Sequence, residues 1–261
     1  MVGALLLRGM LVGVLAGLLN FGFLKIAGEP AVDSAIAFES ALDAAKAEAK
    51  AKAMAAQGMP APKEEPEPEL VSREVQAGIG LFTGVVVYSA AFGGLFAIAF
   101  ALAYGRIGDL SPRATAAVLA ALGIIAVYIL PNLKYPANPP SVGDPETIGT
   151  RTGLYFAMIA LSLAAMIVAG TLRSRLQARH GAWNAVLIAG GVYLVAMIAV
   201  CFALPAVNEV PEQFPATVLW QFRIASLGAQ LILWASLGLG FGWVAEHVTE
   251  RVGLRPRMAP L

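Results

Sequence analysis

The sequence predicts an all-α membrane protein, a bundle of about six transmembrane helices with one extra solvated helix. Apolar residues make up 58% of the 261-residue chain and charged residues only 13%, which is about half the charged share of a typical soluble domain. The apolar residues also come in blocks of about 20, the length that a helix needs to cross a bilayer. We therefore expect lipid to be the solvent for most of the chain, which forms a single membrane domain.

Six blocks are long and apolar enough to be predicted as spans. They are 2–27, 77–104, 114–130, 153–172, 182–204 and 217–244. The first could be mistaken for a secretory signal, but no small-residue cleavage site precedes the acidic stretch that begins at Gly28, so we interpret it as a retained span.

Glycines recur every four residues in three of the predicted spans. They are Gly9, Gly13 and Gly17, then Gly80 and Gly84, then Gly238 and Gly242. This spacing places them on one face of a helix, where the absence of a side chain lets a neighbouring backbone approach. The pattern predicts close helix packing, against the alternative of chance in a glycine-rich chain.

Between the first two spans, the sequence predicts a solvated segment in two parts. Residues 29–58 are rich in alanine, with opposite charges at helical spacing such as Glu48 and Lys52, which predicts a helix in water. Residues 60–70, PAPKEEPEPEL, combine proline with charge and cannot bury enough apolar surface to fold. We interpret them as a flexible acidic linker.

The stretch 131–152 stands out as a polar loop between apolar blocks. It holds five prolines, Pro131, Pro136, Pro139, Pro140 and Pro145. Since each fixes φ and removes a backbone donor, we expect no regular helix to run through it. A loop on a rigid scaffold is a common place for binding residues, although a mere turn outside the membrane is the alternative.

Charge predicts the topology. Short loops near Arg106 and Arg173 and the C-terminal tail are rich in arginine, whereas the other side of the predicted bundle carries eight basic against fourteen acidic residues. By the positive-inside rule, both termini are predicted to be cytoplasmic in a cell inner membrane. The 29–58 helix, the proline-rich loop and the segment 205–215 then share the outer face.

Oxygen donors on the outer loops are the candidate metal ligands. The carboxylates are Asp144, Glu146, Glu209 and Glu212, and Asn138 and Asn208 add neutral amide oxygens. Hard and borderline divalent cations accept such ligands, although an acidic vestibule could also concentrate cations without coordinating them.

Three further polar residues are candidates for the pathway or for structural pairing. Arg8 and Lys25 lie toward the two ends of the first span, whereas Arg223 lies within the last one, where a charge is costly enough to suggest function. We expect it to pair with Glu209 or Glu212. Glu29 and Asp33, four residues apart beyond the first span, carry the same weak signal as the loop carboxylates.

Several function classes find no support in the sequence. There is no phosphate-binding loop, GxSxG, HExxH or CxxC motif, so neither ATP hydrolysis nor common hydrolytic chemistry has a visible location, and we expect a protein that is not an enzyme. His180 and His247 lie at predicted span ends and Cys201 lies in an apolar run. No basic cluster suggests nucleic acid binding.

Five strings in the chain together resemble the CbtA family of bacterial multi-pass membrane proteins. They are GEPAVD from Gly28, SREVQAGIGLFTG from Ser72, YGRIGDLSPRAT from Tyr104, KYPANPPSVGDPETIGTRTGLY from Lys134 and LPAVNEVPEQFPATVLWQFRIASLGAQLILW from Leu204. The resemblance implies a subunit that takes up cobalt as Co²⁺ in support of cobalamin synthesis, without a permanently bound cofactor. It also implies a small single-span partner, CbtB. This chain departs from the family pattern at 46–69, where histidines are often found and none occurs here.

The sequence thus predicts a membrane subunit of a cobalt uptake system whose outer loops form a cation entrance. The alternative is a non-conducting subunit that anchors a small metal-binding partner. A membrane enzyme is the weakest possibility, because no nucleophile with an adjacent base is visible.

Overall fold

The computed structural model describes residues 2–57, 71–140 and 142–251, and these residues form helices and no strand. Five helices in this part of the chain are long and apolar enough to cross a membrane. The predicted all-α membrane fold is confirmed. The count is five and not six because the predicted spans 153–172 and 182–204 are counted together as α7, although the backbone of Gly181 between them is not helical.

Helices α1 (Val2–Ala27) and α4 (Leu81–Ala103) form the tightest pair in the bundle. A Cβ atom on Gly9 would overlap the carbonyl of Gly93, and one on Gly13 would overlap that of Ser89. The predicted packing of the first glycine stripe is confirmed. The short helix α3 (Arg73–Val75) and the π-helical turn η1 (Gln76–Gly80) lead directly into α4.

The other two glycine pairs differ from each other. Gly238 and Gly242 pack against Ala120 and Ala116 of the neighbouring helix, as predicted. The prediction for Gly80 and Gly84 is wrong, because a Cβ on Gly84 would meet nothing within 4 Å. Spacing identifies a helix face, but it does not place a neighbour against that face.

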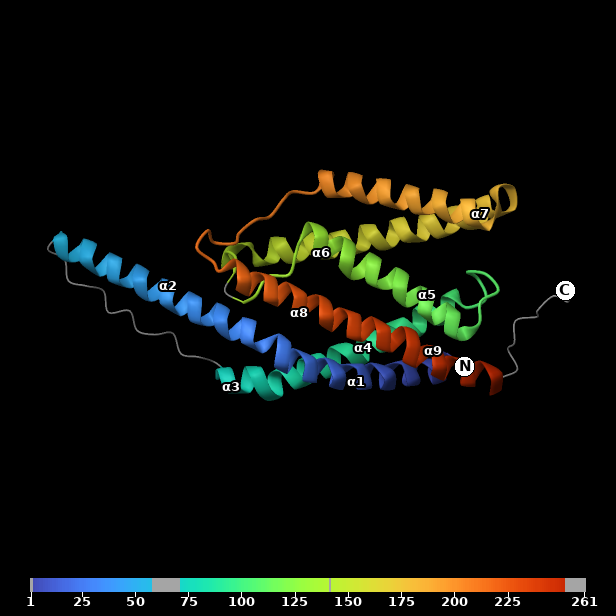
Figure 1. Cartoon of the computed structure of the whole chain (residues 1–261), viewed down its shortest axis with the longest axis horizontal. Helices are drawn as coiled ribbons and strands as arrows, with labels where there is room; N and C mark the ends of the chain where they lie inside the picture. Colours follow the sequence, from blue (N-terminus) through green and yellow to red (C-terminus); the bar gives the residue numbers. More distant parts are fainter. Residues whose placement is uncertain (1, 58–70, 141, 252–261) are drawn as a thin grey trace.

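Helix α2 (Glu29–Ala56) follows α1 after Gly28 and extends away from the bundle (Figure 1). Its alanines favour a helix, and Glu48 and Lys52 form an exposed ion pair at helical spacing. Only its first turns are packed, with Ala31 and Ala35 buried. The predicted helix end at Gly58 and the predicted linker 60–70 lie outside the described residues.

Pro131 lies within a helix, contrary to the prediction that the regular helix ends there. Helix α5 (Pro112–Ile124), the π-helical turn η2 (Ile125–Ile129) and α6 (Leu130–Lys134) are continuous. The π turn η2 shifts the pattern of backbone hydrogen bonds just before Pro131. The N–H that proline lacks is therefore missing at a point where the regular helical hydrogen bonds are already interrupted. The connecting loop is correspondingly shorter than 131–152, since the 3₁₀ turn η3 (Pro145–Thr147) begins the next helix.

Helix α7 (Ile148–Ala203) folds back on itself at Gly181, where φ is 77° and ψ is 163° (Figure 1). The two arms pack against each other through Met158 and Met197. Ser162 Oγ on the first arm lies 2.8 Å from Tyr193 Oη on the second. The hairpin therefore supplies two antiparallel apolar arms.

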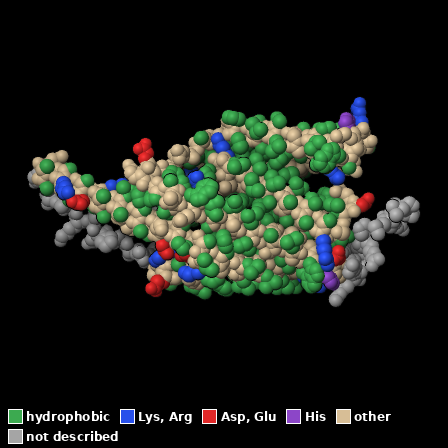
Figure 2. Space-filling model, viewed as in Figure 1, with side chains coloured by type: hydrophobic (Ala, Val, Ile, Leu, Met, Phe, Trp, Pro, Cys, Tyr) green, Lys and Arg blue, Asp and Glu red, His purple; other side chains and the backbone are tan. Residues whose placement is uncertain are grey.

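Helix α8 (Ala216–Ala235), the π-helical turn η4 (Ser236–Phe241) and α9 (Gly242–Arg251) close the bundle. The end of α9 lies at the same end of the bundle as the start of α1 (Figure 1), and Glu246 forms an ion pair there with Arg113. Hydrophobic side chains cover the middle of the visible face, while most charged side chains lie toward the two ends and on α2 (Figure 2). This is the distribution expected of a bundle that spans a bilayer.

Candidate functional site

Two connections meet at the end of the bundle from which α2 extends, hereafter the loop end. They are the α6–α7 loop (135–147) and the α7–α8 loop (204–215). Val142 from the first and Phe214 from the second pack with Ala35 and Phe38 of α2. The backbone N–H of Asp144 also donates to Glu209 Oε2 at 2.9 Å. The two acidic loops predicted to be ligand-bearing are therefore in direct contact.

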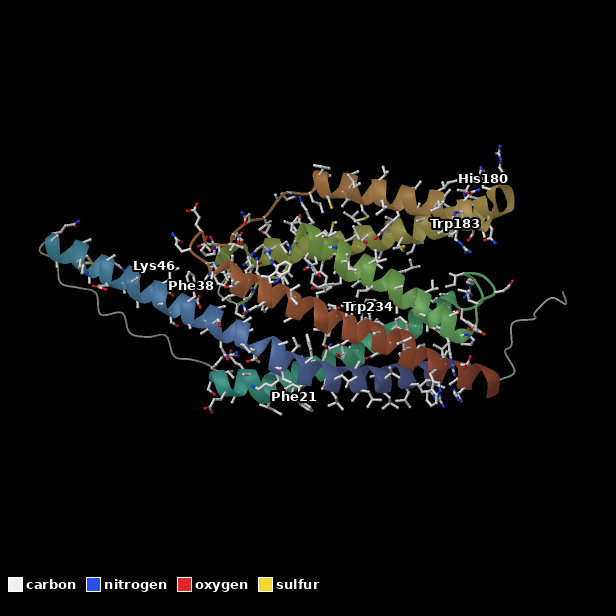
Figure 3. The ribbon with its side chains drawn as sticks, viewed as in Figure 1. Phe21, Phe38, Lys46, His180, Trp183 and Trp234 are labelled. Carbon is white, nitrogen blue, oxygen red and sulfur yellow. The ribbon has the colours of Figure 1, made fainter. Side chains whose placement is uncertain are left out.

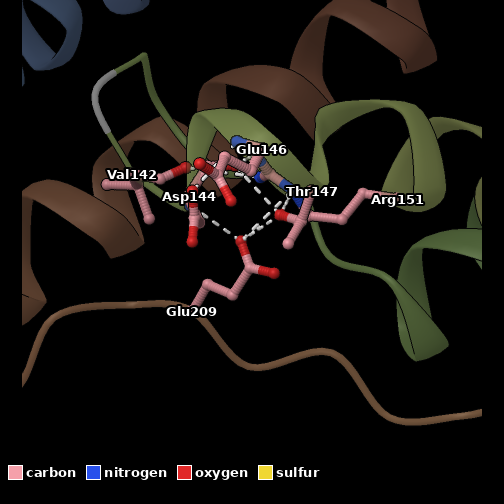
Figure 4. Close-up of polar contacts among 6 residues, drawn as sticks. All are labelled: Val142, Asp144, Glu146, Thr147, Arg151 and Glu209. Carbon is pink, nitrogen blue, oxygen red and sulfur yellow. Dashed lines mark hydrogen bonds and ion pairs between the residues drawn. The ribbon is translucent and has the colours of Figure 1, made fainter.

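Glu209 is the centre of this contact (Figure 4). Besides the Asp144 N–H, its Oε2 accepts from Thr147 Oγ1 at 2.9 Å and lies 3.3 Å from Arg151 Nε. The backbone hydrogen bond from Asp144, the hydroxyl of Thr147 and the charge of Arg151 together hold the pKa of Glu209 below its ordinary value. Glu209 is thus ionised at neutral pH, and its carboxylate oxygen is held by hydrogen bonds from Asp144 and Thr147 and by the ion pair with Arg151.

Arg151 is surrounded by oxygen atoms of the α6–α7 loop. Its Nη2 donates to the Asp144 carbonyl at 3.1 Å and its Nε to Thr147 Oγ1 at 3.1 Å. Gly143, with φ of 112°, passes so close that a Cβ atom there would overlap the guanidinium. The loop backbone is therefore shaped around the arginine, which ties the start of α7 to Glu209.

The other predicted carboxylates are exposed at the same end. Asp144 Oδ1 accepts from the Glu146 N–H at 2.9 Å and so caps η3, while the side chains of Glu146 and Glu212 face solvent. Asn208 is exposed as well. Within the described ranges, no group of three or more His, Cys, Asp or Glu is arranged to hold a metal ion. The arrangement can attract a cation electrostatically, but it offers no closed ligand cage.

Arg223 and Asn138 are brought together, but the expected ion pair of Arg223 is wrong. Arg223 Nη2 donates to Asn138 Oδ1 at 2.9 Å, and its Nε donates to the Ala137 carbonyl at 3.1 Å. Glu209 is instead engaged by Arg151. In the described part of the chain, uncharged oxygen atoms of the α6–α7 loop therefore take the place of the expected carboxylate partner.

Glu29 and Asp33 form a separate structural cluster. Both carboxylates contact Arg73 Nη2, and Asp33 Oδ1 also accepts from Arg73 Nε at 3.1 Å. Glu29 is 9% exposed, so its charge is compensated where α2 begins. These two residues fasten α2 to the start of the second span and do not join the carboxylates of the loops.

The histidines lie at the opposite end of the bundle. His180 is at the turn of α7 (Figure 3), and His247 on α9 contacts the Trp243 carbonyl through Nδ1 at 2.8 Å. Cys201 is partly buried beside the methionines between the arms of α7. The two histidines are therefore far from the loop contact, whereas Cys201 packs in one cluster with Tyr135 and Leu204, where the two loops begin.

Thr147 and Gly143 were not predicted as parts of the site, and Arg151 was recognised only as one of the polar side chains of the stretch 131–152. Arg151 and Thr147 carry a weak signal, since their spacing of four residues places them on one helical face. The acceptors of Arg151 include backbone carbonyls, which any residue type supplies, so no sequence pattern identifies them.

The sequence matches one family model over nearly its full length. The model is described as "Probable cobalt transporter subunit (CbtA)" and matches residues 2–246. The match includes all the apolar helices, helix α2 and both acidic loops. Comparisons with curated proteins and with solved structures found no match.

Proposed function

This chain belongs to the CbtA family of probable cobalt transporter subunits, and we propose that it is the membrane subunit of a cobalt uptake system that supplies cobalamin synthesis. The single observation that carries the proposal is the extent of the match, residues 2–246. It covers the whole apolar bundle together with the loop end, so both the membrane part and its polar entrance belong to what the family has in common.

The exposed carboxylates at the loop end support a role in attracting a divalent cation. Asp144, Glu146 and Glu212 present oxygen atoms to solvent around the engaged Glu209. Clustered like charges raise the local concentration of counter-ions and speed their arrival. Because no ligand cage is formed among the described residues, the proposed function of this surface is capture and transfer rather than storage.

A subunit needs partners. With no ATP-binding motif in the sequence, the energy for uptake would come from an ion gradient, the membrane potential or another chain. The proposed partner is a small single-span protein of the CbtB type that carries the stronger ligands. We place both termini of the present chain in the cytoplasm and the loop end outside, in the inner membrane.

A second function has a specific observation in its favour. The absence of a group of metal ligands in the described residues also suits a non-conducting subunit that anchors a metal-binding partner. In that case the exposed carboxylates would contribute to docking rather than to capture.

Radiolabelled cobalt accumulation tests both functions. Cells that lack their own cobalt uptake would express this chain alone, the presumed partner alone, or both together. Accumulation with this chain alone would show that the path lies within it. Accumulation only with both would favour the anchoring function or a shared path, and no accumulation under any condition would contradict the cobalt assignment.

The carboxylates can be tested in the same cells. Replacing both glutamates, Glu209→Gln and Glu212→Gln, should slow uptake at limiting cobalt. The double variant loses two negative charges that attract the cation, and it weakens the contact between the two loops. Asp109→Asn, which removes a single exposed carboxylate at the opposite end of the bundle, is the control for charge loss away from the loops. Unchanged uptake at normal expression would remove the two glutamates from the pathway.

A further inference from the structure

Helix α8 carries a stripe of polar side chains into the bundle. Arg223, Ser226, Gln230 and Trp234 follow each other at intervals of three, four and four residues, which places them on one face of the helix. Polar groups within a membrane span are costly, so they face the bundle interior or a water-filled space. The stripe begins at the loop end and reaches roughly the middle of the bundle, where Trp234 lies (Figure 3).

The partners of this stripe come from several different segments. Arg223 is held by the α6–α7 loop. Ser226 Oγ lies 3.0 Å from Tyr128 Oη in the π turn η2, and the Gln230 side chain is hydrogen-bonded by Tyr88 of α4.

Phenol groups from two separate parts of the fold, Tyr128 of η2 and Tyr88 of α4, thus meet one face of α8. Tyr88 is 51% exposed, so its side chain also reaches the outer surface of the bundle.

Trp234 ends the stripe with an unsatisfied donor. The residue is 6% exposed, and its Nε1 has no hydrogen-bond partner among the described residues. A buried indole N–H normally finds an acceptor. Water is the acceptor that such a polar position accommodates most readily.

Beyond Trp234 the interior becomes aromatic and apolar. Its ring lies edge-on to Phe92 and Phe96, with centroids 5.3 and 6.3 Å apart. Phe241 stacks edge-on against Phe96 and Phe100 at 5.6 and 5.3 Å, and Leu237 beside it is fully buried. Such a hydrophobic constriction excludes water and ions until it is widened.

We propose that the polar face of α8 lines a water-filled vestibule that opens at the loop end and is closed at Trp234 by the aromatic cluster. Its occupant is a hydrated divalent cation, whose water shell the neutral phenol, hydroxyl and amide groups bind. Arg223 at the entrance carries the same sign of charge as the cation and is paired in the described structure with neutral acceptors, so the vestibule holds a cation weakly, which suits passage. The identity of the ion rests on the proposed function, whereas the entry of water does not.

Thiol labelling tests the vestibule. In a Cys201→Ala background, single cysteines are placed at Ser226 and Gln230, at Ile224 and Leu231 as exposed positions off the stripe on the same helix, and at Leu237 beyond the cluster. Sealed vesicles of both orientations receive membrane-impermeant thiol reagents, one cationic and one anionic. Gel filtration in detergent confirms that each variant is folded.

The expected result is labelling of S226C and Q230C at least ten times faster than of I224C and L231C, with no labelling of L237C. Cobalt at millimolar concentration should slow the labelling of Q230C. The same experiment with magnesium shows whether any divalent cation has this effect. Stripe cysteines that react no faster than the other two positions would overturn the vestibule. Rapid labelling of L237C would overturn the closure at Trp234.

A second variant tests the closure directly. Trp234→Ala removes the ring that contacts Phe92 and Phe96, so L237C should become reactive from the loop end in this background. If it stays unreactive while S226C is labelled, the closure does not depend on Trp234. Labelling in cells that accumulate no cobalt would leave the vestibule standing and contradict only the proposed function.

Discussion

At the scale of single residues, Glu209 is the carboxylate on which the loop contact depends. Three groups favour its ionised form, so its pKa lies below the ordinary value of 4.5. A depressed folded-state pKa contributes stability above the unfolded-state value, and this contribution is lost as the pH falls through the folded-state value. The stabilising effect of Glu209 should therefore be present at pH 7 and absent in strong acid.

Glu209→Gln should lower the Tm of the purified protein in detergent at pH 7, and the difference from the unmodified protein should shrink as the pH falls below 4.5. Protonated glutamate and glutamine are then nearly equivalent. Thermal unfolding across a pH series measures this. Glu212→Gln is the control, since the described structure gives that exposed side chain no partner, and a Tm difference that is independent of pH would contradict the assignment.

Gly143 is the second residue whose identity the loop requires. An alanine there would adopt a φ of 112° and place its Cβ against the Arg151 guanidinium. Gly143→Ala should cost about 1–3 kcal/mol in unfolding free energy. Gly149→Ala, at an open helical position of α7, should be neutral or slightly stabilising, and equal effects of the two substitutions in thermal unfolding would show that the loop is not shaped around Arg151.

At the scale of elements, the pairing of α1 with α4 depends on missing side chains. A Cβ on Gly13 would overlap the Ser89 carbonyl, so Gly13→Ala should push the helices apart and cost about 1–3 kcal/mol. Gly84→Ala, on α4 with nothing within 4 Å, is the matched control. Thermal unfolding in detergent compares them, and a harmless Gly13→Ala would mean that the pair tolerates a wider separation.

The elements also show what sequence can and cannot predict. Apolar blocks and the stripe of Gly9 and Gly13 predicted helices and a packed face, because both signals are local and periodic. The fastening of Glu29 to Arg73 joins residues 44 positions apart, and the helical course through Pro131 depends on a π turn before it. Neither leaves a periodic signal, since each is decided by contacts made only in the folded bundle.

The candidate site was predicted unevenly for the same reason. Residue types identified the acidic loops, and the structure brings Asp144 and Glu209 together. The partner of Arg223 was predicted wrongly, because nearness in sequence favoured Glu212 and Glu209. Arg223 instead donates to neutral oxygen atoms of the α6–α7 loop. One of these is a backbone carbonyl, which every residue type carries, so the sequence gives no signal for it.

At the scale of the whole molecule, the two chain ends of the bundle lie on the same side (Figure 1), and the proposed topology places that side in the cytoplasm. A C-terminal green fluorescent protein should therefore fluoresce, and alkaline phosphatase inserted after Asn208 should be active. The reverse pattern of activities would invert the proposed orientation and would place the acidic loop end inside the cell.

The reversal at Gly181 has a consequence for biosynthesis. One residue with a positive φ, Gly181, reverses the chain between the two arms of α7, so the connection between the arms is short. We therefore expect the two arms to enter the membrane as one hairpin, in which the first arm sets the direction of the second. Arg173, Arg175 and Arg179 precede the turn and would retain it on the cytoplasmic side, so a single insertion event orients both arms.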